Sequence, residues 1–221
     1  MVFDLQDVGA RFYTYISSLH YIMEACAENN IPFWILDRPN PNGIIVDGPI
    51  LEPAFTSFVG MHPVSLLHGM TIGEYGQMVN GEKWLKNGIR CIDYTREMKY
   101  SLPVKPSPNL PHDQAVNLYA SLCLLEGTNV SVRRGTELQF QIYVSPYLPQ
   151  SNFSLIQKPS FGAQNPVYNG VECYGQDLST VAKVNRLALK CLIRAYAKTT
   201  DESKFFNPFF SKLATTKKLQ L

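Results

Sequence analysis

The chain has 221 residues and a formal net charge of +2 at pH 7; 45% of its residues are hydrophobic and 17% are charged. This balance allows one large domain or two small ones with a packed core, and it excludes a mainly disordered chain. No run of basic residues exceeds two, so nucleic acid is a poor candidate partner. The sequence as given has neither a signal peptide nor an apolar span of about 18 residues that could cross a membrane.

The cysteines point to buried free thiols. All five, at positions 26, 91, 123, 173 and 191, lie in apolar surroundings, and no two form a Cys-x-x-Cys pair. This spacing favours neither zinc ligands nor a disulfide framework. We expect no metal site.

Polar side chains concentrate in residues 4–15. An apolar run precedes two carboxylates and Gly9, and apolar residues then recur at spacings of three and four from Phe12 to Cys26, which predicts a strand, a glycine turn and a helix. Because ligands of open α/β sheets bind at the carboxyl ends of strands, the following residues are expected to cluster there: Asp4, Asp7, Arg11, Tyr13 and Tyr15. In the structural alternative, Asp7 caps the helix and Arg11 forms a surface ion pair.

The two ends of the sequence indicate a fragment. Residues 1–3 are typical of the last part of a buried strand, and residues 217–221 end without a terminating signal. We expect that the chain starts inside a domain and is cut at its other end too. Residues 1–221 alone should then be poorly stable and nearly inactive, because strands that would pair with the first one are absent.

A second buried strand is predicted at residues 33–36. It is followed by Asp37, Arg38 and a rigid Pro-Asn-Pro-Asn-Gly turn at 39–43. The charged pair would point into the same strand-end crevice, although a loop salt bridge is the plain alternative. Residues 44–69 look irregular and are typical of a binding loop or lid. At its end His68 could hold a substrate oxygen or be an ordinary loop histidine.

A helix is predicted from the capping box Thr71-Ile72-Gly73-Glu74 to about residue 87, followed by a strand at 89–94. The order strand–helix–strand–loop–helix–strand predicts a parallel, doubly wound sheet. No Gly-x-Gly-x-x-Gly or P-loop motif follows a strand, so we expect no cofactor, and a nicotinamide oxidoreductase is a weak alternative. Prolines at 106–111 predict a rigid connector that holds Asn109. We expect two domains, at residues 1–105 and 106–221.

The richest polar cluster lies at residues 126–136, after the apolar run 114–125. It holds Glu126, Asn129 and Arg134 beside serine, threonine and glycine, which favours a functional loop over a plain one. Beyond it we expect a half-exposed strand at 138–144, a loop at 150–170, a strand at 171–174 and an amphipathic helix at 181–195. Four phenylalanines at 205–210 are expected in the core.

Five motifs in order carry a resemblance to a known family. They are Asp-Leu-Gln-Asp-Val-Gly-Ala-Arg-Phe-Tyr-Thr-Tyr (4–15), Leu-Asp-Arg-Pro-Asn-Pro (36–41), His-Gly-Met-Thr-Ile-Gly-Glu (68–74), Pro-Ser-Pro-Asn-Leu-Pro (106–111) and Glu-Gly-Thr-Asn-Val-Ser (126–131) with Arg-Gly-Thr (134–136). Together they closely resemble the bacterial exo-β-N-acetylmuramidases, the NamZ-type peptidoglycan hydrolases. The particular residues in these motifs look most like those of family members from Bacteroidetes.

The resemblance implies an α/β fold, with a partial Rossmann-like parallel sheet and a second, smaller α/β domain. It implies release of N-acetylmuramic acid from the non-reducing end of peptidoglycan fragments, in the periplasm or outside the cell. Family members have a Pro-Glu-His-Gly motif before this start, and they usually carry glutamate and glycine where this chain has Val132 and Arg133. A catalytically inactive or truncated sugar-binding protein is therefore the alternative function.

Glycosidic cleavage usually needs two carboxyl groups, with tyrosine as an occasional substitute. The candidate catalytic residues are Glu126, Asp37 and Tyr13. Burial after an apolar run could make Glu126 a proton donor. An arginine would bind the lactyl carboxylate of muramic acid through two hydrogen bonds. The candidate substrate-binding residues are Arg11, Tyr15, Arg38, Asn40, His68, Asn109, Asn129 and Arg134.

Overall fold

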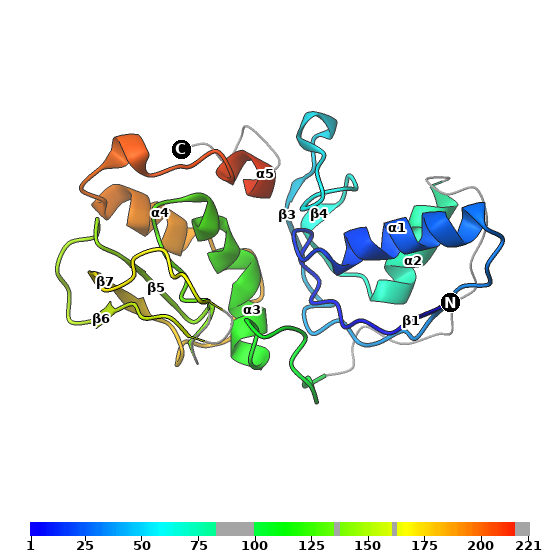
Figure 1. Ribbon diagram of the computed structural model, residues 1–221, viewed down its shortest axis with the longest axis horizontal. Coiled ribbons are helices and arrows are strands. Elements are labelled where there is room, and N and C mark those ends of the chain that lie inside the picture. Colours follow the sequence, from blue (N-terminus) through cyan, green and yellow to red (C-terminus); the bar gives the residue numbers. More distant parts are fainter. Residues whose placement is uncertain (83–99, 135–137, 161–162, 215–221) are drawn as a thin grey trace. The chain divides into compact units, whose positions relative to one another are not determined.

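A computed structural model describes residues 1–82, 100–134, 138–160 and 163–214 (Figure 1). The chain divides into two compact units, Met1–Ser101 and Leu102–Leu221. The described residues contain helices together with one parallel pair of strands, one antiparallel pair and one antiparallel three-stranded sheet. The expected α/β class is confirmed.

The first unit contains a short parallel pair of strands. β1 (Val2–Phe3) pairs with β2 (Trp34–Ile35), with Val2 opposite Trp34 and Phe3 opposite Ile35. Phe3 and Ile35 pack into the core, whereas Val2 and Trp34 are 58% and 63% exposed. The prediction of two fully buried strands is therefore wrong for the described residues, because only one face of this pair is covered.

Helix α1 (Tyr15–Glu28) supplies the other side of this core. It begins after a loop in which Gly9 has a φ of 75°, a conformation that favours glycine. It ends at the predicted stop, where Asn30 takes a left-handed φ of 54°. The core of the unit consists of Phe3, Ile16, Leu19, Met23, Val64, Ile72, Tyr75 and Val79.

Residues 44–69 are more regular than their composition indicates. β3 (Val46–Ile50) and β4 (Ser65–His68) form an antiparallel pair, and η1 (Pro53–Phe55) lies between them. The expectation of an irregular segment is wrong here. The register shifts between Asp47 and Ile50, so Gly48 and Pro49 sit in a bulge where proline does not interrupt the ladder.

Helix α2 (Ile72–Gly81) begins as predicted. Thr71 Oγ1 accepts from the backbone N–H of Glu74, and the Glu74 carboxylate accepts from the backbone N–H of Thr71 at 2.9 Å. This reciprocal capping box satisfies two N–H groups that the first turn leaves open. The expected helix end near residue 87 and the strand at 89–94 lie outside the described residues.

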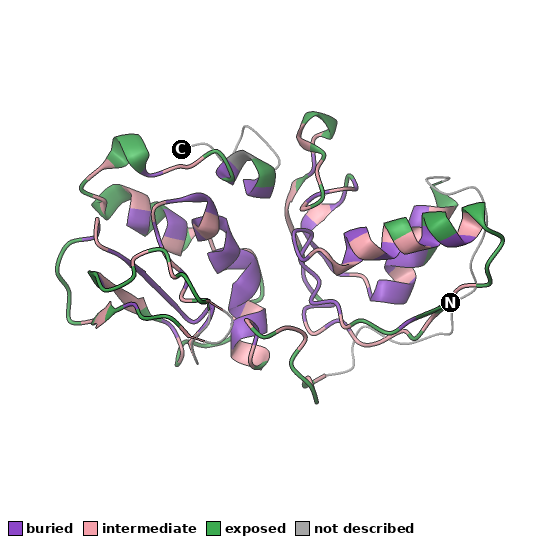
Figure 2. Cartoon of the chain, in the orientation of Figure 1, coloured by how far each residue is buried: buried purple, intermediate pink, exposed green. Residues whose placement is uncertain are grey.

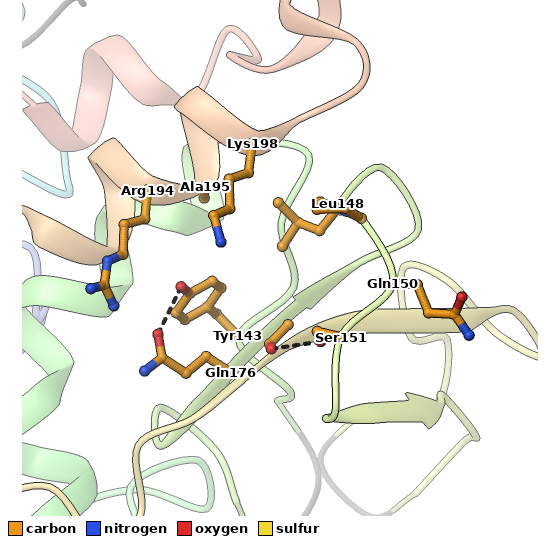
Figure 3. A pocket seen from close by; sticks show the side chains of 10 residues that line it. Tyr143, Leu148, Gln150, Ser151, Gln176, Arg194, Ala195 and Lys198 are labelled. Carbon is orange, nitrogen blue, oxygen red and sulfur yellow. Dashed lines mark hydrogen bonds between the residues drawn. The ribbon is translucent and has the colours of Figure 1, made fainter.

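The second unit places a three-stranded antiparallel sheet beside helices (Figure 1). Its strands, in the order β5-β7-β6, are β5 (Ile142–Ser145), β7 (Glu172–Asp177) and β6 (Ser154–Ile156). Its helices are α3 (Asp113–Leu122), η2 (Cys123–Gly127), α4 (Lys190–Lys198), η3 (Glu202–Lys204) and α5 (Phe210–Ala214). Figure 2 shows α3 as a largely buried helix. Across the sheet, the Tyr143 hydroxyl donates to Gln176 Oε1 at 3.1 Å (Figure 3).

Several expectations for this unit need correction. The strand predicted at 138–144 is a turn until residue 141, and β5 is buried throughout rather than half-exposed. Residues 150–170, expected to be a loop, contain β6, which pairs antiparallel with the distant strand β7. The helix expected at 181–195 begins only at Lys190, since residues 184 and 188 donate their backbone N–H groups to side chains of α3. The strand at 171–174 is confirmed, and residues 106–111 contain neither a helix nor a regular strand, as expected.

Two glycines of α2 give a matched test of the contact between this helix and Asp37. A Cβ added at Gly73 would lie 2.6 Å from the Asp37 Cγ atom, whereas a Cβ at Gly81 would meet nothing within 4 Å. Gly73→Ala should lower the free energy of unfolding by about 1–2 kcal/mol, because it displaces a carboxylate that accepts hydrogen bonds from the first turn. Gly81→Ala should raise it by up to about 1 kcal/mol through helix propensity. Urea denaturation measures both, and stabilisation by Gly73→Ala would contradict the contact.

Candidate active site

The carboxylate of Glu126 and the guanidinium of Arg134 form an ion pair at the edge of a cavity in the second unit. Arg134 Nη2 donates to Glu126 Oε2 at 2.6 Å, and Arg134 Nε donates to Glu126 Oε1. The Arg134 side chain is 47% exposed and the Glu126 side chain 16% exposed. Two parallel bonds of this kind fix the direction of both groups.

The loop that carries this pair is fastened to the sheet. Ser131 exchanges two backbone hydrogen bonds with Val144 of β5, at 2.8 and 2.9 Å. Asn129 donates its backbone N–H to Phe205 O, and Asn207 Nδ2 donates to the Glu126 and Thr128 carbonyls. The candidate residues therefore project from a loop with little freedom to move.

The side chains of Cys123 and Phe140 contact the ion pair from the interior of the unit. Burial raises the pKa of the Cys123 thiol, and so does the Glu126 charge, so the protonated Sγ donates to Glu126 Oε2 at 3.4 Å. Burial opposes the Arg134 charge, but the hydrogen bonds and charge of Glu126 outweigh it and raise the pKa of Arg134. The guanidinium also lies 5.3 Å from the ring centre of Phe140, where a cation is attracted to the ring face.

The cavity measures about 300 Å³, and neutral polar and apolar residues line it in equal number. Ser131 Oγ donates to Gln157 Oε1 at 3.3 Å, and Asn165 and Asn207 complete the polar wall. The sequence analysis did not select Gln157, Asn165 or Asn207. They come from separate loops, and no local motif marks them.

The other two candidates of this unit lie elsewhere in it. Asn129 has both side-chain polar atoms buried without a hydrogen-bond partner among the described residues. Its backbone carbonyl accepts from Ser145 Oγ at 2.6 Å and from the Tyr168 hydroxyl at 2.8 Å. Asn109 lies in the proline-rich turn, and its backbone N–H donates a hydrogen bond to Ser107 Oγ. Neither lines the cavity beside Glu126.

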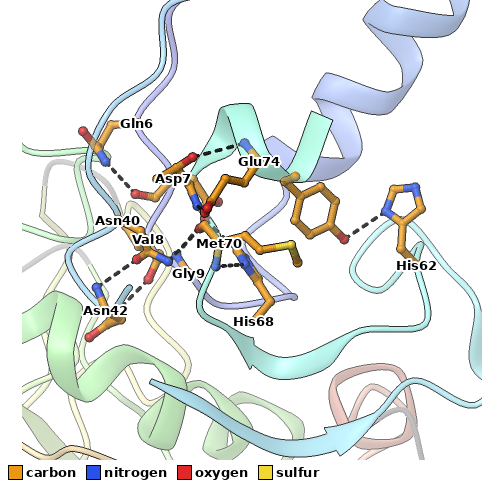
Figure 4. Close-up of polar contacts among 12 residues, drawn as sticks. Gln6, Asp7, Val8, Gly9, Asn40, Asn42, His62, His68, Met70 and Glu74 are labelled. Carbon is orange, nitrogen blue, oxygen red and sulfur yellow. Dashed lines mark hydrogen bonds and ion pairs between the residues drawn. The ribbon is translucent and has the colours of Figure 1, made fainter. Parts of the chain in front are cut away.

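In the first unit, several polar residues meet at a buried junction (Figure 4). Asp7 Oδ2 accepts from the Gly9 backbone N–H at 2.7 Å and lies 3.4 Å from His68 Nε2. His68 Nδ1 accepts from the Met70 backbone N–H at 3.3 Å, so its ring proton is on Nε2 and faces Asp7. Both side chains are almost fully buried.

Two asparagines complete this junction (Figure 4). Asn40 donates to Met70 O at 2.8 Å and accepts from the Asn42 backbone N–H, while Asn42 donates to Val8 O at 2.9 Å. A Cβ at Gly9 would lie 2.5 Å from the Asn40 amide, so glycine permits this close approach. Asn40 and His68, both candidates, are thus brought together with Asp7.

Asp37 is held at the start of α2. Its carboxylate accepts from Thr71 Oγ1 and from the Gly73 backbone N–H, both at 2.8 Å, and from the Arg38 backbone N–H at 3.0 Å. The N-terminus of a helix favours a negative charge. The local geometry is that of a carboxylate that stabilises the helix and joins it to the end of β2.

The candidate cations of this unit have different surroundings. Arg11 is fully buried, and its Nη1 donates to Pro49 O at 2.8 Å and to Val64 O. Burial lowers the pKa of Arg11 to about 10, with the nearby Tyr75 opposing that shift. Arg38 forms an exposed pair with Asp4, Nε to Oδ1 at 2.8 Å. This pair matches the surface alternative considered for Arg38.

The remaining candidates are Tyr13, which is buried, and Tyr15, which begins α1 and is partly exposed. Their ring centres lie 4.7 Å apart at an angle of 60°. Nearby in the unit, the Tyr75 hydroxyl and His62 Nδ1 are 3.0 Å apart, and His62 Nε2 lies 3.0 Å from His20 Nδ1. These rings form a polar chain, buried at Tyr75 and His62 and partly exposed at His20, that was not predicted from the sequence.

Two features are absent from the described residues. No three His, Cys, Asp or Glu side chains there are grouped so that they could hold a metal ion. Within the same residues, no helix has the length and apolar character needed to cross a membrane.

Comparison with known families identifies the chain. The model of the N-terminal domain of exo-β-N-acetylmuramidase NamZ matches residues 1–114, and the model of its C-terminal domain matches residues 117–221. The chain belongs to the NamZ family. The resemblance inferred from the five motifs is confirmed, and both the Glu126 loop and the Asp7 junction fall in segments that the NamZ models cover.

Individual relatives agree with this assignment. Over 156 residues the chain is 46% identical to peptidoglycan β-N-acetylmuramidase NamZ of Bacillus subtilis (strain 168), an alignment covering 67% of the chain and 38% of that protein. A solved DUF1343 family protein from Bacteroides fragilis is 43% identical, with a TM-score of 0.89. A second one, 24% identical with a TM-score of 0.78, shows the fold alone. Each solved structure covers 98% of the chain, which spans 65% of theirs.

The buried His62, which lies against the partly exposed His20, predicts a specific dependence of stability on pH. Burial, and secondarily the charge of His20, lowers the pKa of His62 to about 4 from 6.5. The unfolded chain therefore takes up this proton first as the pH falls, so stability is full above about pH 6.5 and is lost toward pH 4. Between pH 7.5 and 5, His62 should cost about 2 kcal/mol of unfolding free energy.

Urea denaturation at both pH values measures this loss. His62→Gln should remove most of the His62 contribution to the difference between the two pH values, whereas His112→Gln, at an exposed histidine, should leave the difference unchanged. An unaltered pH difference in His62→Gln would show that His62 is not the group responsible.

Proposed function

We propose that this chain carries part of a glycoside hydrolase that releases N-acetylmuramic acid from the non-reducing end of peptidoglycan fragments. The observation that carries the proposal is the Glu126–Arg134 pair beside a cavity of mixed polar and apolar lining, within the segment that matches the NamZ C-terminal model. The relative from Bacillus subtilis is named as a peptidoglycan β-N-acetylmuramidase. Because the chain spans less than two thirds of its relatives, the activity of the whole protein is part of the proposal.

In this proposal Arg134 recognises the substituent that distinguishes muramic acid. The lactyl ether carries a carboxylate, and a guanidinium can bind it through two hydrogen bonds. The neutral polar wall formed by Ser131, Gln157, Asn165 and Asn207 suits the hydroxyl and acetamido groups of a sugar. Asn129, Tyr15, Asn40, His68 and the other candidate contacts stay predictions.

Glu126 is proposed as the catalytic carboxyl group of this unit. With Arg134 bound to both oxygens, it is arranged as an acceptor and not as a proton donor. A substrate carboxylate that takes over the guanidinium would release Glu126, which would then keep only the Cys123 thiol and its apolar surroundings. A general acid or base of a glycosidase must be free to contact the substrate in this way. Asp37 and Tyr13 are proposed as further catalytic candidates.

A second function, sugar binding without turnover, is favoured by a separate observation. Both predicted catalytic carboxylates already hold structural contacts, Glu126 with Arg134 and Asp37 with the first turn of α2. Isothermal titration with a muramic acid disaccharide, beside a hydrolysis assay, separates the two functions. Binding with release of free sugar supports the hydrolase, and binding alone supports the sugar-binding protein.

We also propose that the protein acts outside the cytoplasm, in the periplasm or beyond the cell. Peptidoglycan lies there, and a peptidoglycan-derived sugar is the partner proposed above. Fractionation of the source cells, with an antibody against the chain, tests this location. Recovery with the cytoplasmic markers would contradict it.

Arg134→Ala tests the recognition of the sugar acid. The variant should bind muramic acid sugars about 10- to 100-fold more weakly, because a charge-assisted hydrogen bond contributes roughly 1.5–3 kcal/mol. Binding of N-acetylglucosamine sugars, which lack the carboxylate, should fall much less. Isothermal titration of both sugars provides the comparison, with Arg186→Ala, at an exposed arginine outside the cavity, as the control. Equal losses for the two sugars would rule out this role of Arg134.

A further inference from the structure

The second unit has another cavity, which the proposed hydrolase does not use. It measures about 470 Å³ and lies between α4, the loop at residues 148–151 and the strands β5 and β7 (Figure 3). This volume falls within the range of small-ligand sites. None of its lining residues lines the cavity beside Glu126.

The electrostatic character of this cavity is positive. Arg194 and Lys198 are one helical turn apart on α4, and both side chains extend from the helix toward the strands (Figure 3). No acidic residue is among the described residues that line the cavity, and neither cation pairs with a carboxylate in the described part of the chain. Like charges at this spacing repel each other, so an anion bound between them would relieve that cost.

The neutral lining adds oriented donors and an apolar wall. Gln176 Oε1 accepts a hydrogen bond from the Tyr143 hydroxyl. The NH₂ group of Gln176 therefore points away from Tyr143. Burial, and next the neighbouring Cys191, raise the pKa of Tyr143 to about 12, with Arg194 opposing, so the hydroxyl stays a donor at neutral pH. Leu148 and Pro149 add an apolar part to the lining. An inorganic ion would leave this apolar wall unused.

We propose that this cavity binds a short acidic peptide with two carboxylates. One carboxylate would pair with Arg194 and the other with Lys198. Side chains four positions apart on one helix face start about 5–6 Å apart, and two carboxylates of one peptide can match that separation. The backbone amides would meet Gln176 and Gln150, and the aliphatic part would pack on Leu148 and Pro149. This site stands independently of the glycosidase activity.

Isothermal titration of the whole chain with N-acetyl-alanyl-glutamate tests the proposal. The neutral probe N-acetyl-alanyl-glutamine amide has the same size without the charges, and inorganic phosphate has the charge without the peptide. Arg194→Gln and Lys198→Gln should each weaken binding of the acidic dipeptide about tenfold. Lys190→Gln removes the same charge from an exposed position of α4 outside the cavity and should have little effect.

Three results would overturn the proposal. Equal affinity for the neutral amide would show that the carboxylates do not matter. Equal affinity for phosphate, lost in the same variants, would assign a simple anion site instead of a peptide site. An equal loss in Lys190→Gln would reduce the effect to the general charge of the helix. Circular dichroism of each variant verifies that it remains folded.

Discussion

The burial of Arg11 is the constraint on which the first unit depends. A guanidinium taken entirely out of water is costly unless carbonyl groups or charges compensate for it. Two carbonyls do so, those of Pro49 and Val64. Pro49 lies in the bulge of β3, where the ladder shifts register and leaves its carbonyl turned to a partner outside the ladder. The bulge and the buried arginine therefore support each other.

The junction around Asp7 extends this constraint along the loop. Gly9, in a left-handed conformation, brings its backbone against the Asn40 amide, and Asp7 accepts its N–H. His68 closes the junction from β4 with its protonated Nε2. Side chains replace here the regular backbone hydrogen bonds that an irregular loop lacks. Within residues 4–15, Asp7 and Arg11 thus each hold defined contacts inside the unit.

Local signals in the sequence predicted local structure well. The capping box at Thr71 and the asparagine stop after α1 each depend on residues within one helical turn, and both are present. Pairing between distant segments was harder: β3 was missed because Gly48 and Pro49 look like loop residues until a bulge accommodates them. The late start of α4 depends on side chains of α3 that capture the preceding backbone, which no periodicity reveals.

The same distinction separates the predictable part of the candidate site from the rest. Glu126 and Arg134 are eight positions apart, so one polar cluster indicated both, although not that they would pair. Gln157, Asn165 and Asn207 reach their cavity through tertiary folding alone.

Arg11 and Asp37 of the first unit have partners of a different kind from those of Arg134 in the second. In the first unit, Arg11 donates to backbone carbonyls and Asp37 accepts from the first turn of α2, so removing either would disturb the fold itself. In the second unit, Arg134 is nearly half exposed and pairs with a side chain instead of the backbone. In the proposed recognition of a sugar acid, a ligand anion would replace Glu126 as the partner of Arg134 without breaking any backbone hydrogen bond. The exchangeable pair therefore supports that proposal.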